Sequence, residues 1–151
     1  MTEDDLLKLD NQLCHRFYSV SNAFTRAYRP LLKELDITYP QYLVMLALWE
    51  SHPMAISALV KKCRIDAGAL TLILKKLQQK NLIAILPGDN DKRVKQVSLT
   101  DQGLAAKSHA TAVPKQMLCR IQNLDKREFE QLTYLIDKLY CDLTAKDNSL
   151  D

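Results

Sequence analysis

Glycine and proline are scarce in this chain, whose 151 residues include only three glycines and five prolines. Both residues are unfavourable inside helices, so their scarcity, together with apolar residues repeating every three or four positions, predicts a mainly helical fold. Long hydrophobic runs are also lacking. The longest, from Tyr42 to Trp49, is far shorter than the roughly 20 residues that a helix needs to cross a bilayer. We therefore expect no membrane span.

The first ten residues, MTEDDLLKLD, are acidic and lack the basic-then-apolar order of a secretion signal. We therefore expect a cytoplasmic protein in which cysteines are normally reduced. The chain has no CxxC pair and no cluster of cysteine with histidine, so we expect no zinc site, no other metal and no cofactor. Its length, with 47% hydrophobic and 26% charged residues, is typical of one soluble globular domain covering residues 1–151.

Positive charge is concentrated in the middle of the chain. The segment from Lys61 to Lys95 has nine basic and three acidic residues, a net charge of +6, whereas the remainder has 12 basic and 15 acidic residues, a net charge of −3. A basic region within a nearly neutral chain indicates a surface that faces a polyanion such as DNA.

The N-terminal third predicts two helices. A single apolar stripe predicts one long first helix that Pro30 stops or kinks; it consists of Leu6, Leu9, Leu13, Phe17, Val20, Phe24 and Ala27. Thr38 and Gln41 have the spacing of a capping box, which predicts a second helix over about residues 40–51. Because that helix is apolar on nearly every side, we expect it to be central.

The basic middle third predicts a helix-turn-helix with a β-hairpin. A short helix near 57–64 is followed by Asp66, which can cap a helix over about 67–80. On that helix Leu70, Ile73, Leu74 and Leu77 would face inward, while Thr71, Lys75 and Gln78 face outward. Strands at 82–86 and 94–99 flank a polar turn. This order predicts a winged helix-turn-helix over about 40–100 that binds DNA; the alternative is a charged, solvated face on an ordinary helical domain.

The C-terminal third predicts two more helices. Thr100 can cap one that runs to Cys119 with a bend at Pro114, and Asp125 with Glu128 can cap the last. The last helix has a regular apolar seam made of Phe129, Leu132, Ile136, Leu139 and Leu143. We infer a homodimer built from intertwined helices at about 4–36 and 101–146, and a two-fold protein suits a pseudo-palindromic operator in double-stranded DNA.

The chain resembles the MarR family of winged-helix repressors over essentially its whole length. The resemblance is carried by LKKLQQKNLI (Leu74–Ile83), by Asp91-Lys92-Arg93 in the hairpin turn, and by VSLT (Val97–Thr100) followed by Gly103. It implies DNA contacts from Ala67, Gly68, Thr71, Lys75, Asp91, Lys92 and Arg93. One departure concerns the start of the recognition helix, which usually has small hydroxyl residues, whereas Ala67 and Ala69 flank Gly68 here, and Leu72 replaces a common proline. Thr71 and Lys75 are then the main donors.

The N-terminal block, from Leu13 to Glu50, resembles the subgroup of this family that senses organic hydroperoxides through a cysteine. The resemblance implies that Cys14 is the reactive thiol near the dimer interface and that Tyr28 and Tyr39 of the other subunit donate hydrogen bonds to its sulfur. Tyr18 matches a further aromatic residue of that pocket. Phenol donors would favour the thiolate, which is the nucleophilic form of cysteine.

The subgroup has two variants, one that uses only the first cysteine with a small thiol and one with a second, resolving cysteine. Cys119 matches the position of the resolving cysteine, which implies a disulfide from Cys14 to Cys119 of the partner; the alternative is that Cys119 is a plain interface residue. Cys63 shares a helix face with Leu59, so we expect a core residue. Cys141 falls off the apolar seam and is expected at the surface.

The sequence therefore predicts a homodimeric repressor, not an enzyme, that releases DNA when an organic hydroperoxide oxidises Cys14. One alternative is a MarR-type regulator that binds a small aromatic ligand, with Cys14 incidental. Another is a broader regulator of oxidative stress or virulence. A thiol peroxidase that turns over hydroperoxide is disfavoured, because a peroxidase has no use for a basic winged helix.

Overall fold

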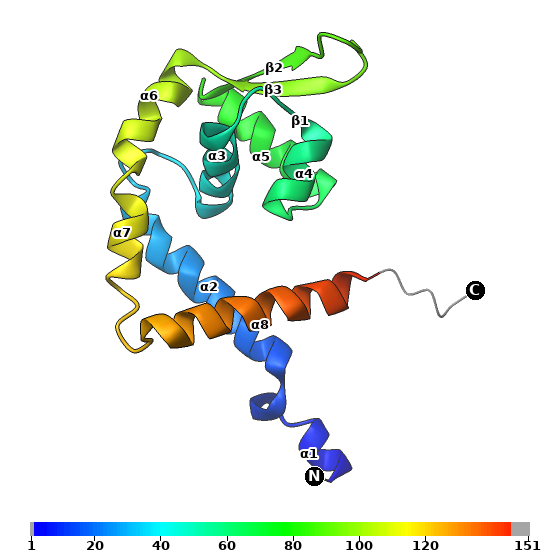
Figure 1. Cartoon of the computed structure of the whole chain (residues 1–151), viewed down its shortest axis with the longest axis vertical. Helices are drawn as coiled ribbons and strands as arrows, with labels where there is room; N and C mark the ends of the chain where they lie inside the picture. Colours follow the sequence, from blue (N-terminus) through cyan, green and yellow to red (C-terminus); the bar gives the residue numbers. More distant parts are fainter. Residues whose placement is uncertain (1, 146–151) are drawn as a thin grey trace, which may run out of the picture. The chain divides into compact units, whose positions relative to one another are not determined.

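A computed structural model describes residues 2–145 and confirms the mainly helical prediction (Figure 1). Its elements are α1 (Glu3–Leu6), η1 (Leu9–Asn11), α2 (Leu13–Leu31), α3 (Tyr39–Glu50), β1 (Met54–Ala55), α4 (Ile56–Cys63), α5 (Ala67–Gln79), β2 (Ile83–Pro87), β3 (Lys95–Leu99), α6 (Asp101–Ala110), α7 (Val113–Leu118) and α8 (Lys126–Thr144). The chain divides into two compact units, Met1–Met117 and Leu118–Asp151. Residues 1 and 146–151, at the ends of the predicted domain and dimerisation segments, lie outside the described residues.

The predicted single helix at the N-terminus is wrong, because it is divided into α1, η1 and α2. Two amide side chains explain the division. The Asn11 Nδ2 group donates to the Asp5 carbonyl at 2.7 Å, and the Gln12 amide donates to the carbonyls of Leu6 and Lys8. These side chains take the place of the backbone N–H groups that would continue the helix. The apolar spacing alone does not reveal such local competition.

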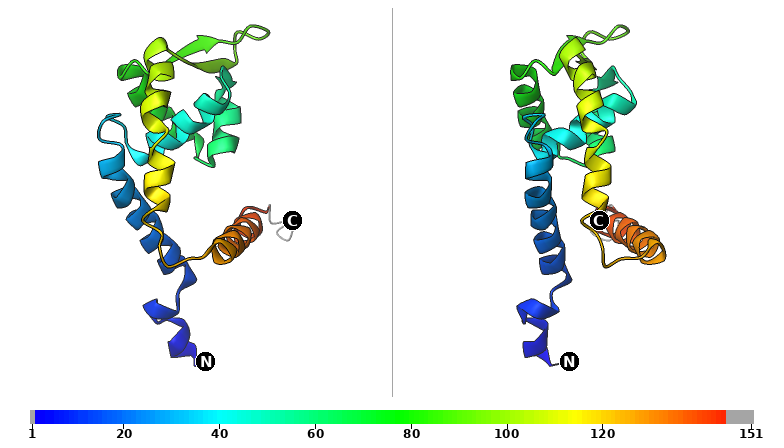
Figure 2. Two further views of the ribbon diagram at one scale, coloured as in Figure 1. Left: turned by 60° about the vertical axis from the view of Figure 1, so that its left-hand side comes forward. Right: turned by 90° about the vertical axis from the view of Figure 1, so that its left-hand side faces the viewer.

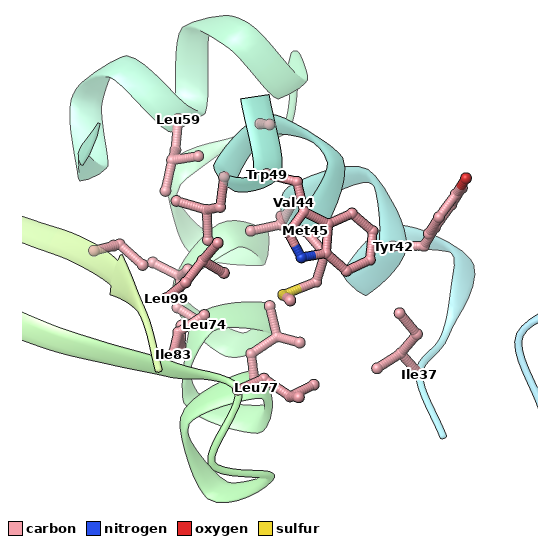
Figure 3. Close-up of a cluster of buried hydrophobic side chains, with 14 of the residues drawn as sticks. Ile37, Tyr42, Val44, Met45, Trp49, Leu59, Leu74, Leu77, Ile83 and Leu99 are labelled. Carbon is pink, nitrogen blue, oxygen red and sulfur yellow. The ribbon is translucent and has the colours of Figure 1, made fainter. Parts of the chain in front are cut away.

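Helix α3 lies at the centre of the core, as predicted. Its N-terminus has the predicted capping box, in which the Gln41 N–H donates to the Thr38 hydroxyl and the Thr38 N–H donates to the Gln41 side chain. The helix buries residues on nearly every side, including Val44, Met45 and Leu48, which are fully inaccessible to solvent. Figure 3 shows Val44 and Met45 in one cluster with Trp49, Leu74 and Leu77, and Leu48 belongs to the same core. The central helix thus holds the N-terminal half of the chain to the helix-turn-helix.

The helix-turn-helix has the predicted form. Helix α4 ends at Arg64 in the left-handed conformation (φ 53°), and the Asp66 carboxylate then accepts a hydrogen bond of 2.9 Å from the Ala69 N–H at the start of α5. Leu70, Leu74 and Leu77 of α5 are buried against the core. Helix α5 is thereby fixed on its inner side, and its outer side is free for solvent or a partner.

The sheet has three antiparallel strands in the order β1-β3-β2, and the sequence predicted only two of them. In the hairpin, Ile83 pairs with Leu99 and Pro87 pairs with Lys95. The additional strand, β1, pairs Met54 with Val97. It has only two residues, too few to show the alternating pattern that identifies a strand from sequence.

A close backbone contact joins the sheet to α3 and α6. The Trp49 indole N–H donates to the Gly103 carbonyl at 2.8 Å, and the Lys107 ammonium donates to the Trp49 carbonyl at 2.9 Å. A Cβ atom at Gly103 would lie 2.0 Å from the Leu82 carbonyl oxygen, so only glycine fits there. The predicted Thr100 cap is present, because its hydroxyl accepts a hydrogen bond of 3.0 Å from the Gly103 N–H. The same hydroxyl donates to the Asn81 carbonyl, in the turn before β2, at 2.6 Å.

The predicted helix from Asp101 to Cys119 is two helices, α6 and α7 (Figure 2). The break at residues 111–112 precedes Pro114, which has no N–H to donate to the Ala110 carbonyl. The second helix ends at Leu118, so Cys119 lies in the turn after α7 rather than on a helix.

The second compact unit contains α8. Its predicted capping box is present, with the Glu128 N–H donating to the Asp125 carboxylate at 2.8 Å and the Asp125 N–H donating to the Glu128 carboxylate at 2.9 Å. No residue of this helix is buried. The apolar side chains of its predicted seam are therefore left without a full covering. Within residues 2–145, no helix has both the length and the apolar character needed to span a membrane.

Candidate functional site

Cys14 is the second residue of α2, and its side chain is exposed. The first half of this helix shows an unusual amount of apolar surface, with Leu13 57%, Phe17 39% and Val20 53% exposed. Tyr18 follows Cys14 by one helical turn and is 69% exposed, so the thiol and this phenol lie on the same side of the helix. The predicted reactive cysteine is thus accessible and has aromatic and aliphatic neighbours.

The other two predicted pocket tyrosines are in direct contact with each other. Tyr28, near the end of α2, stacks on Tyr39, the first residue of α3, and Tyr42 adjoins Tyr28 with ring centroids 5.6 Å apart. Burial raises the pKa of both Tyr28 and Tyr39, and the neighbouring Tyr39 phenol adds to the increase at Tyr28. At neutral pH both groups therefore carry a proton and can donate hydrogen bonds. Tyr42 was not among the predicted pocket residues, although its spacing of three from Tyr39 could have indicated it.

The structure does not bring the Tyr28 phenol to the Cys14 thiol of the same chain. Both residues lie on α2, separated by 14 positions, which at 1.5 Å per residue is about 21 Å along the helix axis. This separation is several times the length of a hydrogen bond. A pocket that contains both residues therefore requires a second copy of the chain.

The remaining cysteines differ in their surroundings. Cys119 is exposed, and its carbonyl accepts a hydrogen bond of 3.2 Å from the Gln122 amide. Cys141 is also exposed, as predicted. Cys63 packs against the core, as predicted; burial raises the pKa of its thiol, an effect that the nearby Lys62 ammonium partly opposes. Among the described residues, no three side chains of the metal-binding types come together.

The outer face of α5 carries the predicted DNA-contacting residues of that helix. Ala67, Gly68, Thr71 and Lys75 are all exposed. The Thr71 hydroxyl donates to the Ala67 carbonyl at 2.8 Å, so its proton is already used within the helix. Lys75 is consequently the main free donor on this part of the helix.

The β2–β3 turn carries the other predicted DNA-contacting residues, Asp91, Lys92 and Arg93, all exposed. The Asp91 carboxylate accepts from the Arg93 backbone N–H at 3.0 Å and from its Nε at 3.4 Å. The Gly88 N–H donates to the Val94 carbonyl at 2.6 Å, and a Cβ atom at Gly88 would lie 2.9 Å from two backbone oxygens. The turn is therefore closed tightly at its base, and Asp91 holds Arg93 at its tip.

A groove of about 410 Å³ lies between α5 and the wing, the hairpin of β2 and β3. It is lined by Gln78, Ile85, Leu86, Pro87, Lys92 and Lys95. Lys95 was not among the predicted DNA-contacting residues, although it lies two positions after Arg93 in the same basic run. With Lys75, Lys92 and Arg93 it gives this side of the molecule a positive charge suited to a phosphate backbone.

Comparison with known proteins places these features in one family. The model of the MarR family matches residues 37–95. The organic hydroperoxide resistance transcriptional regulator of Bacillus subtilis is 38% identical over 136 residues, which are 90% of this chain and 90% of that protein.

Two solved structures of AbfR, a protein of Staphylococcus epidermidis, are also similar. Reduced AbfR bound to DNA is 30% identical with a TM-score of 0.74, over 94% of this chain and 96% of that one. Overoxidised AbfR bound to DNA is 32% identical with a TM-score of 0.70, over 91% of this chain and 99% of that one. These matches, together with the three-stranded winged helix, show that this chain belongs to the MarR family of DNA-binding transcriptional regulators.

Proposed function

We propose that this protein is a homodimeric repressor that releases its operator when an organic hydroperoxide oxidises Cys14. Two observations carry the proposal: an accessible thiol at the start of α2, and two stacked, half-buried, protonated phenols, one near the end of α2 and one at the start of α3. The similarity to the hydroperoxide resistance regulator, over nine-tenths of both chains, supports it.

A homodimer would bring these groups together. In an antiparallel arrangement of two α2 helices, Cys14 of one chain lies opposite the Tyr28–Tyr39 pair of the other. The exposed apolar side chains of α2, with those of α8, supply the surface for such an interface; Phe129, Leu132, Leu135 and Ile136 of α8 are between 38% and 50% exposed. Surfaces of this kind on a small protein mark interaction sites.

The first chemical step is attack of the Cys14 thiolate on the distal oxygen of the hydroperoxide. A sulfur–oxygen bond forms, the oxygen–oxygen bond breaks, and the alkoxide takes a proton and leaves as an alcohol. The sulfur is oxidised by two electrons to a sulfenic acid, and the peroxide is reduced. The tyrosine phenols assist because hydrogen bonds to sulfur stabilise its charged form.

The second step is attack on the sulfenic acid by the Cys119 thiol of the partner subunit. A disulfide forms and water leaves. The exposed position of Cys119 in the turn after α7 supports this role, since a turn residue has more freedom to approach a partner than a residue inside a helix. The covalent link would change the spacing of the two α5 helices; complete release requires a difference of about 5.5 kcal/mol between the two states.

DNA binding would place the N-terminal half of α5 in the major groove and the wing at the adjacent backbone. Lys75 reaches the bases or phosphates from α5, while Lys92 and Arg93 do so from the wing. The Thr71 hydroxyl, which already donates to the Ala67 carbonyl, contacts a base only as an acceptor. Asp91 acts by holding Arg93, because its carboxylate accepts from the Arg93 backbone N–H at 3.0 Å and from the Arg93 Nε at 3.4 Å. The small residues Ala67 and Gly68 would let the helix backbone come close to the bases.

The test is the affinity of the reduced protein for DNA from upstream of its own gene, measured by fluorescence anisotropy before and after one equivalent of cumene hydroperoxide per thiol. We expect the wild type to lose DNA binding after the peroxide and to regain it when dithiothreitol is added. The Cys14→Ser variant should keep its DNA affinity after the same treatment. Excess peroxide is a necessary control, because AbfR is bound to DNA in an overoxidised form. Unchanged affinity in the wild type after one equivalent would contradict the proposal.

A second candidate is a regulator that responds to a small aromatic ligand. A groove of about 270 Å³ in the first compact unit favours it, because its lining combines aromatic rings with a cation. The lining includes Tyr42, Leu46, Trp49 and Lys107, together with Glu50, whose carboxylate pairs with the Lys62 ammonium at 2.6 Å. If an aromatic carboxylic acid such as salicylate lowers DNA affinity and hydroperoxide does not, this candidate replaces the redox switch.

A further inference from the structure

We infer that Leu72 reads operator sequence by packing against the C5-methyl group of a thymine in the major groove. The inference rests on the docking of α5 given above but not on the redox switch. It concerns a residue outside the predicted set of DNA-contacting side chains.

Leu72 has the position on α5 that faces furthest from the core. The buried residues Leu70 and Leu74 are each two positions away, which on a helix of 3.6 residues per turn is an angle of about 160°. Leu72 is 67% exposed, and no other large apolar side chain of α5 is so accessible. A leucine at such a position is not explained by packing within the chain.

The neighbours of Leu72 on the outer face favour DNA as its partner. Gly68 lies one turn before it and Lys75 one turn after it, so the leucine is flanked by a position without a side chain and by a cation. Lys76, the next residue, is also exposed. An apolar group surrounded by small and positive neighbours suits a polyanion that carries an apolar group of its own.

The hydrogen-bonding capacity of this face is low. The Thr71 hydroxyl donates to the Ala67 carbonyl, and Ala67, Gly68 and Leu72 have no polar side-chain atoms. Apart from Lys75, the first half of α5 therefore cannot use the donor pattern that usually distinguishes bases. The thymine methyl is the apolar feature of the major groove, and apolar side chains recognise it by contact.

The test uses a duplex that the reduced wild-type protein selects from a randomised pool, with each thymine replaced in turn by deoxyuridine. This change removes the methyl group and leaves the hydrogen-bonding groups of the base in place. A methyl group covered by Leu72 contributes about fourfold in affinity. We therefore expect its removal to weaken binding about fourfold at one thymine in each half-site, and other thymines to show no effect. All binding is measured in dithiothreitol, so that oxidation of Cys14 plays no part.

Two variants complete the experiment. In Leu72→Ala we expect weaker binding to the thymine duplex and no further loss with deoxyuridine, because the methyl contact is already absent. Leu72→Met keeps an apolar side chain and should keep most of the deoxyuridine effect. Leu72 is exposed, so both variants should have the thermal stability of the wild type.

Three results would overturn the inference: a selected duplex without a thymine common to its half-sites, no deoxyuridine effect in the wild type, or an equal effect in Leu72→Ala. Failure of the docking itself is distinguishable, because Lys75→Ala and Arg93→Ala would then leave DNA affinity unchanged. If those two variants weaken binding while deoxyuridine has no effect, the docking stands and the role of Leu72 is wrong.

Discussion

Tyr28 and Tyr39 stack nearly parallel, with ring centroids 4.4 Å apart and planes inclined by 16°. The contact joins the end of α2 to the start of α3, two elements that the chain connects through a seven-residue turn region at 32–38. Burial keeps both phenols protonated at neutral pH. Because Tyr39 is the first residue of α3, a displacement of either ring would also displace the N-terminus of this central helix.

The first prediction concerns how the tyrosines act on Cys14. Tyr28→Phe removes the phenol donor, so we expect cumene hydroperoxide to oxidise Cys14 about tenfold more slowly, since one hydrogen bond to a charged group is worth about 1.5 kcal/mol. DNA affinity of the reduced variant should equal that of the wild type. Stopped-flow measurement of the rate of sulfenic acid formation checks the first point.

Mixed dimers decide whether the phenol acts across the interface. A dimer of one Cys14→Ser chain with one Tyr28→Phe chain retains a single Cys14, which faces the intact Tyr28 of its partner, and should react at the wild-type rate. The matched control pairs a wild-type chain with a chain carrying both substitutions, and should react slowly. The reverse order of rates would place the phenol and the thiol in the same chain.

The second prediction concerns stability at alkaline pH. The pKa of Tyr28, Tyr39 and Tyr42 is raised above 10.0 in the folded protein, mainly by burial. The unfolded chain therefore loses these protons at lower pH than the native protein does. The native state binds more protons in that window, so stability is complete below about pH 10 and falls as pH rises through the native pKa values.

The replacement Tyr28→Phe removes one of these groups. The free energy of unfolding of the wild type and of the variant is measured in urea at about pH 8 and again near pH 11. Between these two pH values the wild type should lose more stability than the variant does. Tyr134→Phe is the control, because Tyr134 is 61% exposed on α8. An equal shift in the control would show that the stacked cluster is not responsible.

Local signals in the sequence correctly predicted the helices whose start is set by a single capping side chain. Thr38, Asp66, Thr100 and Asp125 cap the helices that they were expected to cap, because the capping oxygen and the N–H group that donates to it are only three residues apart. Apolar periodicity failed where another local interaction overrides it. The amides of Asn11 and Gln12 end the first helix, and β1 depends on pairing with Val97 more than 40 residues away.

The candidate site was less predictable for a different reason. The resemblance named Cys14, Tyr28 and Tyr39, but spacing alone could not show that Tyr28 and Tyr39 are stacked, because the contact depends on how the turn at Asp36 directs α3. Similarly, the sequence predicted Thr71 on the outer face as a donor to DNA, but its hydroxyl donates to the Ala67 carbonyl within the helix. Side-chain partners of this kind appear only once the backbone is placed.

The third prediction compares two glycines. Gly103→Ala would place a Cβ atom 2.0 Å from the Leu82 carbonyl oxygen, so the backbone must shift and the Trp49–Gly103 hydrogen bond of 2.8 Å is lost. We expect a loss of about 3 kcal/mol in the free energy of unfolding.

The matched control is Gly68→Ala, where the new Cβ atom would meet only the Asp66 carboxylate, at 3.3 Å. The higher helix propensity of alanine offsets that contact, so stability should change by less than about 1 kcal/mol. Urea unfolding measures both variants. Equal stability of the two would show that the approach of Leu82 to Gly103 is not a constraint.

The fourth prediction concerns the charges that face DNA. Lys75→Ala and Arg93→Ala should each reduce the slope of log affinity against log salt concentration by about one, because each removes a contact with a phosphate. Lys8→Ala is the charge control and should leave the slope unchanged, since Lys8 pairs with Asp5 at 2.7 Å outside the basic region. Anisotropy titrations over a range of salt concentrations give all three slopes.

The fifth prediction tests the disulfide. After one equivalent of cumene hydroperoxide, the wild type should run as a covalent dimer on a non-reducing gel, and Cys119→Ser should run as a monomer with a sulfenic acid at Cys14. Cys141→Ser is the matched control, because Cys141 is also an exposed thiol of the same compact unit, and it should still form the covalent dimer. A covalent dimer in Cys119→Ser would exclude Cys119 as the resolving residue. If, in addition, DNA release in Cys119→Ser then required an added small thiol, the chain would use the one-cysteine form of the switch, with Cys14 alone essential.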